Sequence, residues 1–215
     1  MSRMAAETDR RTERGFDRFV NFSDAVVAIA ISLLILPLVD AANDTIGGDT
    51  TALDFVQENG DRLLAFGLSF VVIASYWVAH HAVFEDVRTY STPLVWWNLA
   101  WLATIVFLPL PTEILAVQGA TGPFVRFIYI ASVLAVSVGI VAIELVIDHT
   151  PDIRIDPAAP RPSTAARLVM PALIVIALIV GTTVEAIGLW AMFLTALAGP
   201  IATRVDRHGR SARAG

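Results

Sequence analysis

Long runs of apolar residues with almost no charge recur along this chain, and each approaches the ~20 residues that an α-helix needs to cross a bilayer. The 215-residue chain is 56% hydrophobic and only 16% charged, with a mean hydropathy of +0.67. A soluble domain carries about 25% charged residues, so we expect an all-α integral membrane protein. Six membrane-spanning helices fit the pattern, at residues 18–38, 62–84, 93–115, 124–147, 167–184 and 186–203. The last two are short and meet at a tight turn around Glu185, where a re-entrant hairpin is the alternative.

The placement of arginine predicts how these helices are oriented. All 15 basic residues are arginine, and nearly all of them lie in the two tails and in the second-to-third and fourth-to-fifth connections, which six spans place on one side. The first connection, on the other side, is acidic, with Asp40, Asp44, Asp49, Asp54, Glu58 and Asp61. By the positive-inside rule both termini are expected in the cytoplasm, with the protein spanning the plasma (inner) membrane of a bacterium.

The domain organisation is expected to be simple. We predict one six-helix transmembrane domain over residues 1–215, with cytoplasmic tails at 1–16 and 204–215. Residues 149–165 form a proline-rich cytoplasmic linker, and four prolines in it predict an extended segment. We expect no cleaved leader, because the first apolar stretch is long, begins with Ser23 and Asp24, and is followed by further spans.

Several kinds of chemistry are excluded by composition and motif. The chain has no cysteine, which excludes disulfides, thiolate metal sites and cysteine nucleophiles. It has no lysine, which excludes Schiff-base and Walker-type chemistry. It contains neither a Gly-x-Ser-x-Gly nor a His-Glu-x-x-His motif. We therefore expect no enzyme and no catalytic residue, and we expect no nucleic-acid partner.

A few polar residues are predicted to meet inside the membrane near its cytoplasmic side. A carboxylate such as Asp24 costs about 2.5–3.5 kcal/mol at the centre of a helix in lipid, so it needs protein or water around it. His80 and His81 close the second span and Asn98 opens the third, which brings them to the same depth. We expect a network that ties three helices together, in which Asp24 accepts hydrogen bonds from a histidine or pairs with Arg18.

Two other roles remain open for the same residues. A metal site is possible, because Asp24, His80 and His81 have side chains that can bind a metal ion, although adjacent histidines on a helix diverge by about 100°. The same groups carry proton-relay chemistry. The network itself predicts neither a metal nor a cofactor.

The first span also carries a stripe on another of its sides. Ile29, Ser32, Leu33 and Leu36 follow the i, i+3, i+4, i+7 spacing of one helix face. Asp24 precedes Ile29 by five residues and lies about 140° around the helix. The stripe and the polar network therefore face different directions. Taken alone, the stripe fits a lipid-facing surface or a packed core.

The first span resembles a known family. Residues Arg18 to Ile31 read Arg-x-x-x-Phe-Ser-Asp-Ala-Val-x-Ala-Ile-Ala-Ile, which closely resembles the first-helix signature of the prokaryotic branch of the transmembrane protein 175 potassium channel family. Trp77, His81 and Phe84 in the second span and Asn98 in the third are also similar to the pattern of that family. The resemblance covers three of the six predicted spans by motif.

The resemblance implies a homotetramer in which the first helix of each subunit lines a central pore. It implies a pore constriction at Ile29, Leu33 and Leu36 and a selectivity layer at Ser32. The network that braces the pore helix is implied to contain Arg18, Ser23, Asp24, His81, Trp97 and Asn98. The expected function is a passive, weakly selective potassium channel with no cofactor, whose partners are the bilayer and permeant monovalent cations such as K⁺. Ser32 stands where many relatives have threonine, and Ala28 replaces a hydroxyl seen in some, so we expect only a small preference for potassium.

A second reading keeps the membrane fold and changes the ion. It is a proton-conducting channel or a proton-coupled transporter that uses Asp24 and His81. Transporters often have helices broken at mid-membrane and internal repeats, and we find neither in this sequence apart from Pro109 and Pro171 near the ends of predicted helices. The channel reading is therefore preferred.

Overall fold

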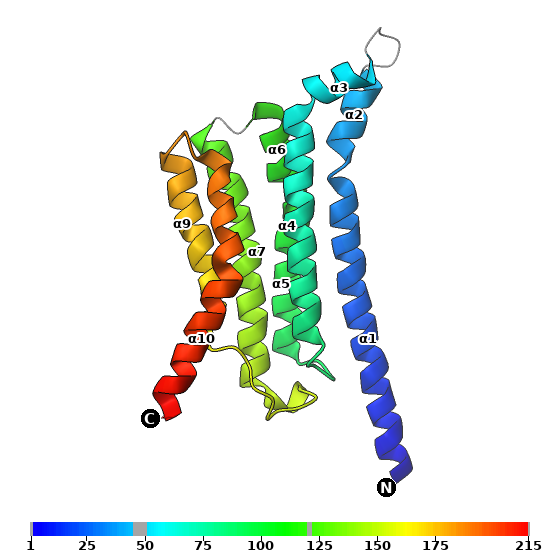
Figure 1. Cartoon of the computed structure of the whole chain (residues 1–215). Helices are drawn as coiled ribbons and strands as arrows, with labels where there is room; N and C mark the ends of the chain where they lie inside the picture. Colours follow the sequence, from blue (N-terminus) through cyan, green and yellow to red (C-terminus); the bar gives the residue numbers. More distant parts are fainter. Residues whose placement is uncertain (1, 45–50, 120–121, 215) are drawn as a thin grey trace.

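The computed structural model describes the backbone of residues 2–44, 51–119 and 122–214 and the side chains of 14–44, 51–119 and 122–207. The described chain is almost entirely helical (Figure 1). Its helices are α1 (Ser2–Leu33), α2 (Leu36–Asp44), α3 (Ala52–Glu58), α4 (Gly60–Phe84), α5 (Thr92–Phe107), α6 (Pro109–Gln118), α7 (Pro123–His149), α8 (Thr164–Arg167), α9 (Val169–Thr183) and α10 (Ala198–Ala214), with 3₁₀ segments η1 (Pro151–Ile153) and η2 (Gly188–Leu197).

The prediction of six spans is confirmed. Six segments of the described chain are long and apolar enough to cross a membrane: 14–44, 60–84, 92–118, 123–149, 164–183 and 188–207. Both termini lie at one end of the bundle, while α2 and α3 lie at the opposite end (Figure 1). We call these the terminal end and the α2–α3 end. α1 stands at one edge of the bundle, and α9 and α10 form the other edge.

α7 is the centre of the core and packs against α5, α6 and α9. Tyr129, Ile130, Val133 and Val136 repeat at helical spacing along its buried side. Trp101 of α5 is fully buried and lies over Gly139, where a Cβ atom would come within 2.8 Å of Trp101 Cδ1. The absence of a side chain at this glycine therefore allows α5 and α7 to approach closely.

Gly139→Ala is expected to lower the free energy of unfolding by about 1–3 kcal/mol, because the added methyl overpacks the contact with Trp101. The measurement is thermal unfolding of the purified protein in detergent. Gly67→Ala is the matched control, since nothing lies within 4 Å of a Cβ there. That variant is expected to gain up to about 1 kcal/mol from helix propensity. Equal melting temperatures for the two variants would contradict a close α5–α7 contact.

Prolines divide two spans that the sequence predicts as continuous helices. The first breaks at Leu34 and Ile35, because Pro37 has no N–H and its ring crowds the carbonyl of Leu33. The third breaks at Leu108, immediately before Pro109. Each pair of pieces, α1 with α2 and α5 with α6, still forms one membrane-length segment.

The last two spans form a hairpin that crosses the bundle twice, and the re-entrant alternative does not describe it. Residues 184–187 make the turn, and Glu185 is exposed there as expected. Gly188 has a φ of +49°, a backbone conformation that suits glycine. A Cβ atom on Gly181 would come within 2.8 Å of the Gly188 carbonyl oxygen. η2 and α10 then run back to the terminal end (Figure 1).

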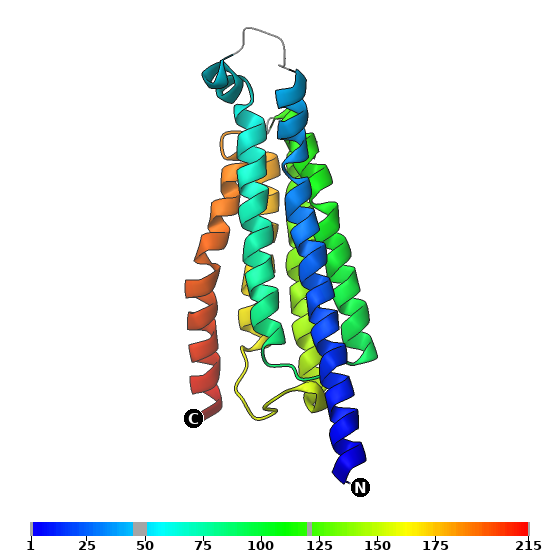
Figure 2. The same ribbon diagram turned by 90° about the vertical axis from the view of Figure 1, so that its right-hand side faces the viewer.

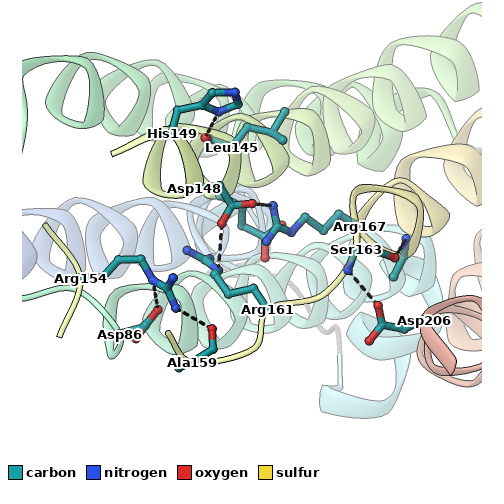
Figure 3. Close-up of polar contacts among 12 residues, drawn as sticks. Asp86, Leu145, Asp148, His149, Arg154, Ala159, Arg161, Ser163, Arg167 and Asp206 are labelled. Carbon is teal, nitrogen blue, oxygen red and sulfur yellow. Dashed lines mark hydrogen bonds and ion pairs between the residues drawn. The ribbon is translucent and has the colours of Figure 1, made fainter. Parts of the chain in front are cut away.

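The linker that follows α7 is held to the connection between α4 and α5. The amide of Arg88 donates to Ile153 O at 2.9 Å, and the amide of Ile155 donates to Asp86 O at 2.9 Å, so the two segments pair as a short antiparallel bridge. Arg154 Nε also donates to Asp86 Oδ2 at 2.8 Å (Figure 3). The proline-rich segment is thus anchored to the end of α4.

Candidate functional site

α1 attaches to the rest of the subunit through a single face. It packs against α4 and α5 and touches α6. The residues buried on this face, counting its continuation in α2, are Ser23, Val27, Ala30, Leu34, Leu38 and Ala41. Their helical spacing describes one continuous strip. No other part of the described chain covers the remaining surface of α1 (Figure 2).

The stripe of Ile29, Ser32, Leu33 and Leu36 lies on this uncovered surface. Ile29 is 61% exposed, Leu33 39% and Leu36 49%, and Ser32 is exposed as well. The predicted separation of the stripe from the polar network is therefore present in the structure. Within one subunit the stripe is neither packed nor covered.

Ser32 and Pro37 modify the helix within the stripe. Ser32 Oγ donates to the carbonyl of Ala28 at 2.8 Å, which leaves the lone pairs of the hydroxyl oxygen available. The carbonyl of the next residue, Leu33, has no backbone partner among the described residues, because the residue four positions on is Pro37. The stripe thus combines large apolar side chains with a hydroxyl acceptor.

A buried hydrogen-bonded chain joins α1, α4 and α5. Asn98 Nδ2 donates to Ser23 Oγ at 2.8 Å, and Asn98 Oδ1 lies 2.7 Å from His80 Nε2. An amide oxygen only accepts, so His80 Nε2 carries the proton. The Ser23 hydroxyl in turn donates a hydrogen bond to the carbonyl of Phe19 at 3.1 Å. All three side chains are buried, so their polar groups depend on one another.

Two further contacts complete this group. The ring of His80 stacks between Trp101, with centroids 4.2 Å apart, and Phe84, at 4.3 Å. Trp77 Nε1 donates to Asp24 Oδ1 at 2.8 Å. We call Ser23, Asp24, Trp77, His80 and Asn98 the inner polar cluster. It fixes the rotation of α1, and hence the direction in which the stripe faces.

The histidine of this cluster is not the one that the sequence predicted. His81 was expected in the network, but His80 makes the contact, and His81 lies beside Trp77 and 3.8 Å from Glu85. His80 continues the buried face of α4, which includes Ser69, Ile73, Tyr76, His80 and Phe84, and this spacing is the signal that could have identified it. Neighbouring residues on a helix face directions about 100° apart, so the choice between adjacent histidines decides the contact.

The tryptophan and the arginine also differ from expectation. Trp77 of α4 bonds Asp24, whereas Trp97 of α5 is exposed. Arg18 is exposed and has no polar partner within the described part of the chain. In the residues described, no group of three histidine or acidic side chains converges as a metal site.

A second buried polar group went unnoticed in the sequence. Ser69 Oγ lies 2.7 Å from Thr112 Oγ1 and 3.1 Å from the Tyr129 hydroxyl. These residues join α4, α6 and α7 in the half of the bundle nearer α2 and α3. The sequence of apolar helices gives little indication of which isolated hydroxyl residues will contact one another in the fold.

The acidic residues of the first connection gather at the α2–α3 end. Asp40 and Asp44 lie on α2, Asp54 and Glu58 on α3, and Asp61 at the start of α4, while Asp49 lies outside the described residues. Hydrogen bonds from the Thr51 side chain and amide lower the pKa of Asp54 below its ordinary value. This carboxylate therefore stays ionised at neutral pH.

Known proteins of one family are similar to this chain in the region of the stripe and the inner polar cluster. The sequence model of the endosomal/lysosomal potassium channel TMEM175 matches residues 18–109, which contain the stripe and the inner polar cluster. The crystal structure of a lysosomal potassium-selective channel TMEM175 homolog from Chamaesiphon minutus superposes with a TM-score of 0.63 and 25% identity, over 89% of this chain and 98% of that one. Residues 18–109 are thus similar in sequence to the TMEM175 family, and the fold as a whole is similar to that of a TMEM175 homolog.

Curated TMEM175 relatives match over shorter stretches. A potassium channel of Streptomyces collinus is 40% identical over 95 residues, covering 44% of this chain and 45% of the relative. The human endosomal/lysosomal proton channel TMEM175 is 30% identical over 122 residues, covering 56% of this chain and 23% of the relative. These matches span less than half of each relative. These relatives and the solved structure are all described as ion channels.

Proposed function

We propose that this chain forms a passive, weakly selective potassium channel with no carbonyl selectivity filter. The observation that carries the proposal is the uncovered stripe on α1, directly opposite the face that the inner polar cluster holds in place. A matched relative is named a potassium channel. In this proposal α1 is the wall of the pore, and α4 and α5 are its support.

The pore requires several copies of the chain. One helix cannot enclose a conduit, and α1 stands at an edge of the bundle (Figure 1). Four copies around an axis, with the stripe inward, form a closed ring and cover the apolar surface that a single subunit leaves open. We therefore propose a homotetramer, in keeping with the resemblance of the first helix.

The stripe supplies both a barrier and a weak preference between ions. Rings of Ile29, Leu33 and Leu36 narrow the pore and gate it by excluding water. The hydroxyl ring of Ser32 replaces part of the hydration shell of a passing cation, which favours potassium over sodium only modestly. The acidic α2–α3 end concentrates cations at the mouth.

The proposed membrane is the plasma (inner) membrane of a bacterium, with both termini in the cytoplasm. Two observations support this orientation. Arginines dominate the connections and tails at the terminal end, and carboxylates dominate the opposite end. Both chain termini lie at the same, arginine-rich end of the bundle (Figure 1), and the positive-inside rule places that end in the cytoplasm.

Proton conduction is the second candidate, and one observation favours it. The matched human and chicken relatives are named proton channels. In the structure His81 lies beside Trp77 and 3.8 Å from Glu85, and Trp77 in turn donates to the carboxylate of Asp24. The potassium-channel and proton-conduction hypotheses are distinguished by measuring potassium flux from proteoliposomes with equal pH on both sides. Flux that persists without a proton gradient supports the channel for potassium, and flux that requires a proton gradient rejects it.

Cysteine scanning tests the position of the stripe. Because the natural chain has no cysteine, each introduced thiol is unique in the subunit. Cysteines at positions 29, 32, 33 and 36 are expected to react with a water-soluble, charged thiol reagent and to block potassium flux. Ile179→Cys on α9, whose native side chain is 57% exposed, is the lipid-facing control. Equal reactivity of Ile29→Cys and Ile179→Cys would remove the stripe from the pore.

A further inference from the structure

A second polar assembly lies at the terminal end of the bundle, away from the α1 stripe. Arg154, Arg161 and Arg167 converge there from the linker and from α8 (Figure 3). Their side chains are 8%, 14% and 2% exposed. We call them the arginine cluster. Buried guanidinium groups need acceptors for their N–H bonds, so the partners of each arginine decide what the cluster does.

Arg154 is fully engaged within the fold. Its Nε donates to Asp86 Oδ2 at 2.8 Å, its Nη1 to the carbonyl of Pro157 at 2.9 Å, and its Nη2 to the carbonyl of Ala159 at 3.0 Å. These bonds fix the linker to the end of α4. Each of its three nitrogen atoms thus has a partner within the fold, and the main role of Arg154 is structural.

Arg161 and Arg167 share two carboxylates unequally. Arg167 contacts Asp148 through Nη1 and lies 3.5 Å from Glu144 through Nε. Arg161 meets only Asp148, with Nε 3.3 Å from Oδ1, and its buried Nη1 has no hydrogen-bond partner. Burial lowers the pKa of Arg161, and the attraction of Asp148 opposes this. Nε and Nη2 of Arg167 are also buried without a hydrogen-bond partner among the described residues, but Arg161 is paired with one carboxylate instead of two, and it is the one of these two arginines that lines the cavity described next.

A cavity of about 650 Å³ opens beside this arginine. Arg161, Ser163 and Thr164 line one part of it, and Ala165 and Val205 give it an apolar side. The Ser163 hydroxyl accepts from the amide of Ala166, which leaves its proton free to donate. A guanidinium and two hydroxyl residues therefore line a space large enough for a small anion, next to Asp148, whose carboxylate is paired with Arg161 and Arg167.

We propose that this cavity binds a phosphate-bearing anion, with Arg161 as its main contact and the hydroxyls of Ser163 and Thr164 as supporting donors. The planar fork of a guanidinium matches two oxygens of a phosphate. When Arg161 turns to the ligand, Asp148 keeps Arg167 as its partner. Binding therefore does not leave a buried carboxylate without a counter-charge.

The location favours a phosphate at the membrane boundary. Asp148 is next to the last residue of the fourth span, and Thr164 begins the fifth. Basic pockets between transmembrane helices at this depth bind lipid head groups, and the apolar side of the cavity suits the glycerol end of a lipid. Free phosphate in solution offers the same oxyanion, and the experiment below distinguishes the two sources. The site is independent of the pore, so its failure leaves the channel proposal standing.

The test measures binding to the purified full-length protein in a nonionic detergent. Inorganic phosphate is one arm, and short-chain phosphatidic acid is the other, with diacylglycerol as the matched lipid that lacks only the phosphate. We expect saturable binding in at least one arm and none of diacylglycerol. Binding of phosphatidic acid alone assigns a lipid, and binding of both assigns any accessible phosphate. Absence of saturable binding in both arms overturns the proposal.

Variants locate the binding in the cavity. Arg161→Ala is expected to weaken affinity by at least about tenfold, the size of one lost charged hydrogen bond. Arg161→Lys keeps the charge and loses the fork, so it should weaken binding less. Val205→Phe fills the cavity without changing charge and should also weaken it, which keeps the test decisive if Arg161→Ala does not fold. Arg207→Ala, an exposed arginine on α10 outside the lining, should stay within twofold of the natural protein. Equal losses in Arg161→Ala and Arg207→Ala, or no loss in Val205→Phe, would show that the cavity is not the site.

Discussion

Ile29→Asn is expected to raise potassium conductance roughly tenfold, which corresponds to about 1.4 kcal/mol removed from the barrier to permeation. The physical reason is the proposed constriction: an apolar ring expels water, and an amide ring holds it. The same change should reduce the preference for potassium over sodium, since a wetter ring lets both ions keep more of their hydration shells. The measurement is the current, and its reversal potential, of the reconstituted protein under potassium and sodium gradients.

The control for this experiment is Ile179→Asn. Ile179 is 57% exposed, close to the 61% of Ile29, but it lies on α9 at the other edge of the subunit (Figure 1). Its replacement introduces the same polar group into the membrane surface and should leave conductance and ion preference unchanged. A conductance that does not change in Ile29→Asn, or changes equally in both variants, would exclude Ile29 from the pore.

Asn98→Ala is expected to have the largest effect on folding and assembly. The amide makes two bonds in a buried site, to Ser23 and to His80, and its removal leaves both partners without an acceptor or donor. Each unsatisfied buried group costs about 1–3 kcal/mol. We expect a melting temperature well below that of the natural protein in detergent and a smaller fraction of the oligomer by size-exclusion chromatography.

Thr104→Ala serves as the comparison on the same helix. The Thr104 hydroxyl donates only to the carbonyl of Trp101, within α5, at 2.7 Å, so its loss breaks no link between helices. The Thr104→Ala variant should therefore have nearly the melting temperature and the oligomer fraction of the natural protein. If Asn98→Ala melts like Thr104→Ala, the inner polar cluster does not brace α1. If it assembles normally but conducts with a different ion preference, the cluster belongs to the permeation pathway instead.

The sequence was sufficient to predict the spans, because their signal is composition over about 20 residues. It also predicted that the stripe and Asp24 face apart, because that follows from helix geometry alone. Both predictions depend on averages or on fixed angles. Neither requires knowledge of which helices are neighbours.

The details that failed depend on the neighbours. His80 and His81 are both compatible with contact to Asn98 until α4 is rotated against α5, and only the packing of Trp101 and Phe84 around His80 decides the rotation. Trp77 replaces Trp97 for the same reason. The break before Leu36 could have been anticipated from Pro37. The meeting of Ser69 with Thr112 and Tyr129 could not, because it joins three helices distant in sequence.

The interruption at Leu34 and Ile35 divides the lining of the proposed pore into two rigid rods. Ile29, Ser32 and Leu33 belong to the rod that the inner polar cluster grips, while Leu36 belongs to the short rod beyond the joint. In the proposed pore, a change in the angle between α1 and α2 would change the width at Leu36 and leave the position of Ile29 unchanged. Pro37 would thus let the opening of the proposed pore at Leu36 change separately from the opening at Ile29.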